Sequence, residues 1–192
     1  MPEIDTVPKI TNKLGSTLQQ YNSVIAACED IYLKKVTDYG TSWRMLRPRS
    51  LTDQIFIKAK RIRNIEETGT QMVNEGTDDE YRGIINYCLI ALIQMELHAD
   101  ENVELNYDDS KRLYEEQVEK ARSLMLSKNH DYGEAWRDMR TTTFTDLILT
   151  KLLRLKQIED NGGKTLISEG SEANYLDIIN YAIFALIKMQ EA

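Results

Sequence analysis

Apolar residues recur at helical spacing in three stretches of the first half of the chain and in three of the second half. The first stretch of each half runs roughly over 17–35 and 109–128, and each of these ends near an Asp-Tyr-Gly sequence whose glycine suits a chain reversal. The third stretches, roughly 79–98 and 173–190, have the broad apolar face typical of a bundle core. The pattern predicts three helices in each half.

The second helix of each half is expected to begin at Ser50-x-x-Asp53 or Thr143-x-x-Asp146, patterns close to a capping box. We therefore interpret Asp53 and Asp146 as helix-capping residues. The segments after these helices are rich in Gly, Thr, Ser and Asn and are expected to be loops. An acidic stretch without apolar periodicity, 99–107, is the expected linker between the halves.

The two halves are copies of one unit. A shift of 93 residues aligns DYGTSWRMLR, from Asp38, with DYGEAWRDMR, and a shift of 94 aligns the third helices; 23 of the 49 positions compared without gaps are identical. An internal duplication of this length predicts an all-α fold of two three-helix repeats, residues 1–100 and 101–192. We expect them to pack as a helical bundle about a pseudo-twofold axis, like a homodimer fused into one chain. A homo-oligomer of the whole chain is a further expectation.

Composition narrows the class of protein. The 192 residues are 42% apolar and 29% charged, as in a helix-rich globular protein, and the net charge of -7 argues against general nucleic-acid binding. Cys28 and Cys88 lie in apolar helical patterns, as free buried thiols do in a reducing compartment. No signal peptide or membrane-length apolar run is evident, so a cytoplasmic protein is expected.

A lysine interrupts the apolar stripe of the second helix in both copies, at Lys58 and Lys151. Lysine is rarely buried without a partner, so each must reach water, an acid or an anionic ligand. Arg61 and Arg154, three residues further on, add a donor fork suited to phosphate or carboxylate. An interhelical salt bridge to Glu66, Glu159 or Asp177 and an anion site explain the pattern equally well.

Oxygen-bearing side chains gather at the start of the third helix of the second copy. Asp177 and Asn180 share a helix face and Glu169 precedes the helix, a set that suits Mg²⁺. In the first copy Gly83 stands where Asp177 stands in the second, so the second copy is the better candidate for a metal. The alternative for Asn180 is a polar contact between helices.

A cluster of acid, aromatic and cation recurs in both copies, as Asp131, Tyr132, Trp136 and Arg137 in the second. Aromatic rings and guanidinium planes stack on nucleobases, so this cluster is a candidate substrate-binding segment. The alternative is that the tryptophan fills the end of the bundle while the acid caps a turn.

The motifs KNHDYGEAW, KLLRL and the helix LDIINYAIFAL resemble the bacterial and phage family of nucleotide modification associated domain 1. The helix pattern is also similar to the all-α nucleotide pyrophosphatases, MazG-like enzymes and dimeric dUTPases, in which acids on two helices bind Mg²⁺. The resemblance covers most of each copy and implies a role in nucleotide metabolism. It places the following residues on family motifs: Asp131, Tyr132, Gly133, Lys151, Arg154, Glu169, Asp177, Asn180 and Tyr181.

Two functions follow from this resemblance. In the first, the protein is a Mg²⁺-dependent nucleoside triphosphate pyrophosphohydrolase in which Glu169 and Asp177, joined by Glu159, hold the metal. Lys151 acts in catalysis, and Arg154 binds phosphate. In the second, it is a nucleotide-binding or assembly module without turnover. The acid that the family often has before the second-helix lysine is Ile57 or Thr150 here, which favours binding alone.

Overall fold

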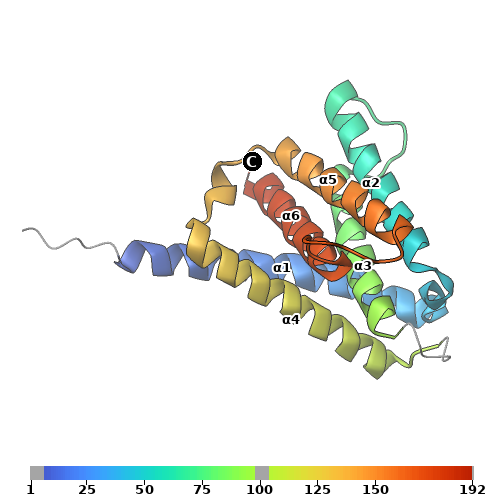
Figure 1. Cartoon of the computed structure of the whole chain (residues 1–192). Coiled ribbons are helices and arrows are strands. Elements are labelled where there is room, and N and C mark those ends of the chain that lie inside the picture. Colours follow the sequence, from blue (N-terminus) through green and yellow to red (C-terminus); the bar gives the residue numbers. More distant parts are fainter. Residues whose placement is uncertain (1–6, 98–103, 192) are drawn as a thin grey trace, which may run out of the picture.

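The computed structural model describes residues 7–97 and 104–191, and every regular element within these ranges is helical. The helices are α1 (Val7–Tyr39), η1 (Ser42–Met45), α2 (Pro48–Thr68), α3 (Thr77–Glu96), α4 (Tyr107–Tyr132), η2 (Ala135–Asp138), α5 (Thr141–Asp160) and α6 (Ser171–Glu191) (Figure 1). The predicted all-α fold of two three-helix repeats is therefore confirmed. The proposed boundary between residues 100 and 101 lies outside the described residues.

Each first helix ends where its Asp-Tyr-Gly sequence predicts. Gly40 and Gly133 both adopt left-handed backbone conformations, with φ of 69° and 61°. The amide of Gly133 donates to the carbonyl of Asn129, and Gly40 does the same to Val36. Because side chains rarely tolerate this conformation, glycine fixes the turn that leads into the short 3₁₀ helix carrying the tryptophan.

The predicted capping role of Asp53 and Asp146 is wrong. Helices α2 and α5 begin earlier, with Arg47 and Arg140 as their N-cap residues. Neither residue makes a side-chain hydrogen bond that caps its helix. Proline at the first position of α2 explains the earlier start, because its fixed φ suits a helix and its missing N–H costs nothing there. Asp53 instead pairs with Lys156 at 2.6 Å, an ion pair between the repeats.

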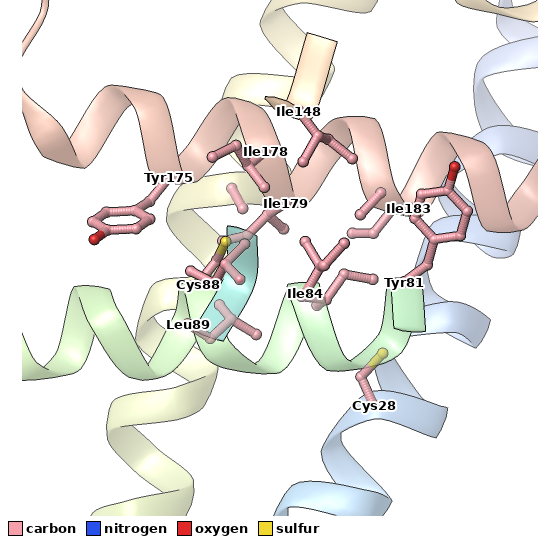
Figure 2. Close-up of a cluster of buried hydrophobic side chains, with 14 of the residues drawn as sticks. Cys28, Tyr81, Ile84, Cys88, Leu89, Ile148, Tyr175, Ile178, Ile179 and Ile183 are labelled. Atoms are coloured by element: carbon pink, nitrogen blue, oxygen red, sulfur yellow. The ribbon is translucent and has the colours of Figure 1, made fainter. Parts of the chain in front are cut away.

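The third helices form the centre of the bundle. Helices α3 and α6 lie side by side and antiparallel, and Figure 2 shows Ile84 and Leu89 of α3 meeting Ile179 and Ile183 of α6. Helices α2 and α5 pack against each other and against this pair, while α1 and α4 run along the other side (Figure 1). Helix α1 contacts α6 and helix α4 contacts α3, so each repeat supplies part of the other's core. The two repeats share one hydrophobic core.

Buried hydrogen bonds repeat across the pseudo-twofold axis. Tyr21 of α1 donates to Asn180 of α6 at 2.9 Å, and its equivalent Tyr114 of α4 donates to Asn86 of α3 at 2.8 Å. Each asparagine amide in turn donates to a backbone carbonyl of its own repeat's first helix. Asn180 is only 4% exposed and is thus a polar contact between helices, the alternative that the sequence left open.

A second symmetric pair of contacts joins α2 to α5. Thr145 hydrogen-bonds both Glu66, at 2.8 Å, and the hydroxyl of Tyr81, at 2.7 Å. Their equivalents make the same contacts in reverse, since Thr52 bonds Glu159 at 2.5 Å and the hydroxyl of Tyr175 at 2.7 Å. Each glutamate therefore holds the opposite repeat.

The environment of Glu66 and Glu159 should make the stability of the protein depend on pH. Burial raises the pKa of Glu66 and of Glu159, although the threonine hydroxyls act in the opposite direction. A carboxyl whose pKa is raised on folding stabilises the fold fully below its unfolded pKa, near 4.3, and this contribution is lost as the pH rises through the folded pKa. Glutamine keeps an oxygen acceptor for threonine without titrating. Urea unfolding from pH 7 to about 4 should therefore show the wild type gaining stability relative to the Glu66→Gln, Glu159→Gln variant; a constant difference would contradict this account.

Cys28 and Cys88 are both free and buried, as predicted. Burial raises the pKa of the Cys28 thiol to about 12, so this thiol packs as a small apolar group and is not reactive. Among the described helices, none has the length and apolar character needed to cross a membrane.

Candidate functional site

In the second repeat, the interrupting lysine is paired with an acid. Lys151 donates to Asp177 at 2.6 Å, and Lys128 of α4 donates to the other oxygen of Asp177 at 2.5 Å. Asp177 is 6% and Lys151 13% exposed as side chains. Burial lowers the pKa of Lys128, but the hydrogen bond and charge of Asp177 outweigh this effect and raise it. The buried carboxylate of Asp177 thus lies between two ammonium groups.

In the first repeat, the cations of the second helix are neutralised by an acid at a different position of the third helix. Lys58 donates to Glu80 at 3.0 Å and Arg61 donates to the other oxygen of Glu80 at 2.5 Å. The equivalent of Glu80 is Asn174, and the equivalent of Asp177 is Gly83. In each repeat, one acid of the third helix therefore neutralises the cations of the second helix, and its position differs by about one turn between the repeats.

The first repeat contains a cavity of about 510 Å³, a volume typical of small-molecule sites. It lies between the end of α1, η1, α2 and the start of α3. Four aromatic side chains line it: Tyr32, Tyr39, Trp43 and Tyr87. Lys58 and Gly83 form part of its wall.

Two positions in the wall of this cavity differ between the repeats. A Cβ atom on Gly83 would lie 2.8 Å from Cε of Lys58, so any larger side chain would enter the space that the Lys58 stem occupies. Ile90, which also lines the cavity, is replaced in the second repeat by Phe184. The Phe184 ring stacks on Trp136, with centroids 4.2 Å apart. In the second repeat, Asp177 and Phe184 thus stand where Gly83, covered by the Lys58 stem, and Ile90 line the cavity of the first repeat.

The charged side chains around the cavity are of both signs. Lys35, the equivalent of Lys128, is exposed and has no hydrogen bond or ion pair within 7–97 and 104–191. Arg82 pairs with Asp79 at 2.9 Å, and both line the cavity together with Glu75. With Gly83 in place of an acid, the two lysines on this wall have no carboxylate directly between them.

The other predicted substrate-binding residues of the second repeat do not form one site with Lys151 and Asp177. Arg137 is used within the fold, because it donates to Thr17 at 2.5 Å and also bonds Gln20, Glu134 and Glu191. Trp136 is buried at the end of the bundle under Arg137 and against Phe184, the alternative that the sequence left open. Asp131 and Tyr132 are exposed at the end of α4.

The three predicted Mg²⁺ ligands are not brought together. Glu159 accepts a hydrogen bond from Thr52 between the repeats, and Asp177 is bound by two lysines. Glu169 lies in an open cleft lined by Lys151 and Arg154, which does not include Asp177. In the described part of the chain no three Asp, Glu, His or Cys side chains form a group that could hold a metal ion. These residues do not fit a three-carboxylate magnesium site.

Sequence reasoning missed several of these residues. Lys35 could have been found, because it aligns with the lysine of the second copy's KNHDYG motif. The exchange of Glu80 for Asn174 was also visible in the alignment. Tyr32 and Tyr87 looked like ordinary core positions, since helical spacing does not distinguish a cavity wall from a packed core.

An all-α fold of two interlocked repeats, with a ligand-sized cavity in the first, defines the class of this protein. The chain matches the nucleotide modification associated domain 1 family over residues 35–95 and 128–189, more than half of its length. It belongs to this family and carries the domain twice, which indicates a nucleotide-related role. No curated protein and no solved structure matches the chain significantly.

Proposed function

We propose that the protein binds a nucleotide in the cavity of the first repeat. One observation carries this proposal: the family-motif positions of that repeat converge on the cavity. Lys35, Tyr39 and Gly40 come from the first motif, Lys58 from the second, and Glu75, Asn86 and Tyr87 from the third. In the second repeat, the equivalent lysines Lys128 and Lys151 are both paired with Asp177, and Glu169 lines a separate cleft.

The chemistry of the cavity walls supports a nucleotide. Aromatic rings stack on bases, and Trp43, Tyr39 and Tyr87 provide such surfaces. Lys35 provides an ammonium group for phosphate, and Lys58, which pairs with Glu80, adds a second positive charge to the wall. Lys35 does not have to give up an ion pair with another described residue to bind phosphate. Tyr39 lines the cavity and is 57% exposed, so its ring is accessible to a base.

The arrangement favours binding over metal-dependent hydrolysis. The acids proposed to hold Mg²⁺ serve internal contacts or lie apart, so the pyrophosphohydrolase function stays a prediction that rests on the resemblance alone. Glu75 and Asp79 line the first-repeat cavity, but Asp79 is already paired with Arg82. We therefore assign the cavity a binding role that needs only this chain's own cations and aromatic rings.

A nucleotide panel tests the function. Purified protein should bind at least one nucleoside phosphate in calorimetry without Mg²⁺, and the affinity should fall with the number of phosphates removed, because lysines recognise the phosphate. Product analysis with Mg²⁺ present tests turnover in the same samples. Release of phosphate or pyrophosphate would restore the hydrolase function. No binding of any nucleotide, with or without Mg²⁺, would overturn the proposal.

A further inference from the structure

The second repeat contains a separate cleft. It can be understood by comparing the contacts of the second-helix arginine in the two repeats. In the first repeat, Arg61 donates to Glu80 at 2.5 Å and to the backbone carbonyl of Glu75 at 2.8 Å. A weaker contact reaches the carbonyl of Val73 at 3.4 Å. Arg61 is thus neutralised by an acid of α3, and it fastens the loop before that helix to α2.

Its equivalent Arg154 has lost this partner. Asn174 stands in place of Glu80, and the Asn174 amide donates to the carbonyl of Gly170 at 2.9 Å. Within the residues that the structure describes, the guanidinium of Arg154 makes no hydrogen bond or ion pair. The loop that Arg61 fastens in the first repeat is consequently not fastened by Arg154 in the second.

A cleft of about 730 Å³ lies between α5 and this loop. Its walls carry the cations Lys151, Arg154 and Lys164, and the single carboxylate Glu169. Lys151 already pairs with Asp177, so Arg154 and Lys164 are the cations left to meet a ligand. Asn174, 3% exposed, forms part of the wall where the first repeat has its carboxylate.

We infer that this cleft binds an oxyanion of the phosphate class, which takes the place of the Glu80 carboxylate. The guanidinium of Arg154 presents a planar pair of N–H donors that matches two oxygens of such an anion, and Lys164 adds a second positive charge from the loop. A bound anion would connect the loop to α5 as Arg61 and Glu80 connect the corresponding elements of the first repeat. This site is distinct from the first-repeat cavity and does not depend on nucleotide binding there.

Arginine Nε–Hε resonances in NMR give a readout specific to Arg154, with inorganic phosphate titrated at constant ionic strength. The Arg154 signal should shift and saturate, and calorimetry should show that Arg154→Gln weakens phosphate binding at least fivefold. Asn174→Glu restores the carboxylate of the first repeat and should weaken binding to a similar extent while leaving Arg154 in place. Arg63→Gln, which changes an arginine in an exposed pair on α2, is the matched control and should bind as the wild type does.

A nucleoside monophosphate titrated in parallel distinguishes the two sources of the anion. If it binds at Arg154 more tightly than inorganic phosphate, the ligand is a nucleotide phosphate. If the two bind equally, the ligand is free phosphate. The Gly83→Asp variant, altered in the first-repeat cavity, should still bind inorganic phosphate at Arg154. An Arg154 signal that does not respond to phosphate would overturn the inference, whatever the first-repeat cavity binds. Unchanged phosphate affinity in Arg154→Gln would do the same, even if Asn174→Glu failed to fold.

Discussion

Replacing Gly83 with aspartate should weaken nucleotide binding to the first repeat at least tenfold while the protein stays folded. The new carboxylate would stand where Asp177 stands in the second repeat, between Lys35 and Lys58, and would repel a phosphate there. At an effective dielectric constant near 20, two unit charges about 4 Å apart interact by roughly 4 kcal/mol, so we expect a loss of affinity of at least tenfold.

The fold should tolerate this change. The Cβ atom would meet Cε and Cδ of Lys58 at 2.8 and 2.9 Å, but these atoms belong to a flexible side chain that can move aside. Removing a glycine from a helix interior is also favourable, by about 0.5–1 kcal/mol. Calorimetry with the best nucleotide of the panel measures the effect, and Asn64→Asp, an acid added on the exposed side of α2, controls for net charge. Wild-type affinity in a folded Gly83→Asp protein would remove the cavity from consideration.

Replacing Lys151 with methionine should destabilise the protein by about 1–4 kcal/mol, because it takes one of two cations from a buried carboxylate. Asp177 is only 6% exposed, and the remaining partner, Lys128, is itself 45% exposed. Methionine fills a similar volume, so the loss reports the missing charge rather than a void.

The matched control is Lys34→Met. Lys34 pairs with Asp30 at 2.7 Å, but both side chains are more than half exposed, and a surface pair of this kind contributes less than about 1 kcal/mol. Urea unfolding of the three proteins compares the two pairs directly. If Lys151→Met were as stable as the wild type yet lost anion binding, Lys151 would be a ligand-binding residue and not a partner of Asp177.

The sequence was a good guide to the helices and their duplication, because helical periodicity and repeated identity are local or pairwise signals. It also identified Lys151 and Asp177 as possible partners. It failed at the starts of α2 and α5, where Ser50 and Thr143 looked like caps but the helices begin before them. A capping motif inside a helix cannot be distinguished from one at its end without knowing which backbone amides are free.

The candidate site was harder to predict for a physical reason. Gly83 was interpreted as the loss of a metal ligand, whereas in the structure the missing side chain makes room for the Lys58 stem, which lines the first-repeat cavity. Glu159 was proposed as a metal ligand because it lies near Arg154 in sequence, yet it bonds Thr52 of the other repeat. Contacts between repeats depend on how α2 meets α5, which the pattern of a single helix does not contain.

The two tryptophans allow the most direct test of nucleotide binding in the first repeat, because Trp43 lines the cavity and its equivalent Trp136 is stacked on Phe184. Fluorescence titration of two single-tryptophan variants, Trp136→Phe and Trp43→Phe, assigns the signal to one repeat. With the best nucleotide of the panel, the protein that retains Trp43 should show a saturable change in emission, and the protein that retains Trp136 should show none. A saturable change from Trp136 together with a silent Trp43 would contradict the account.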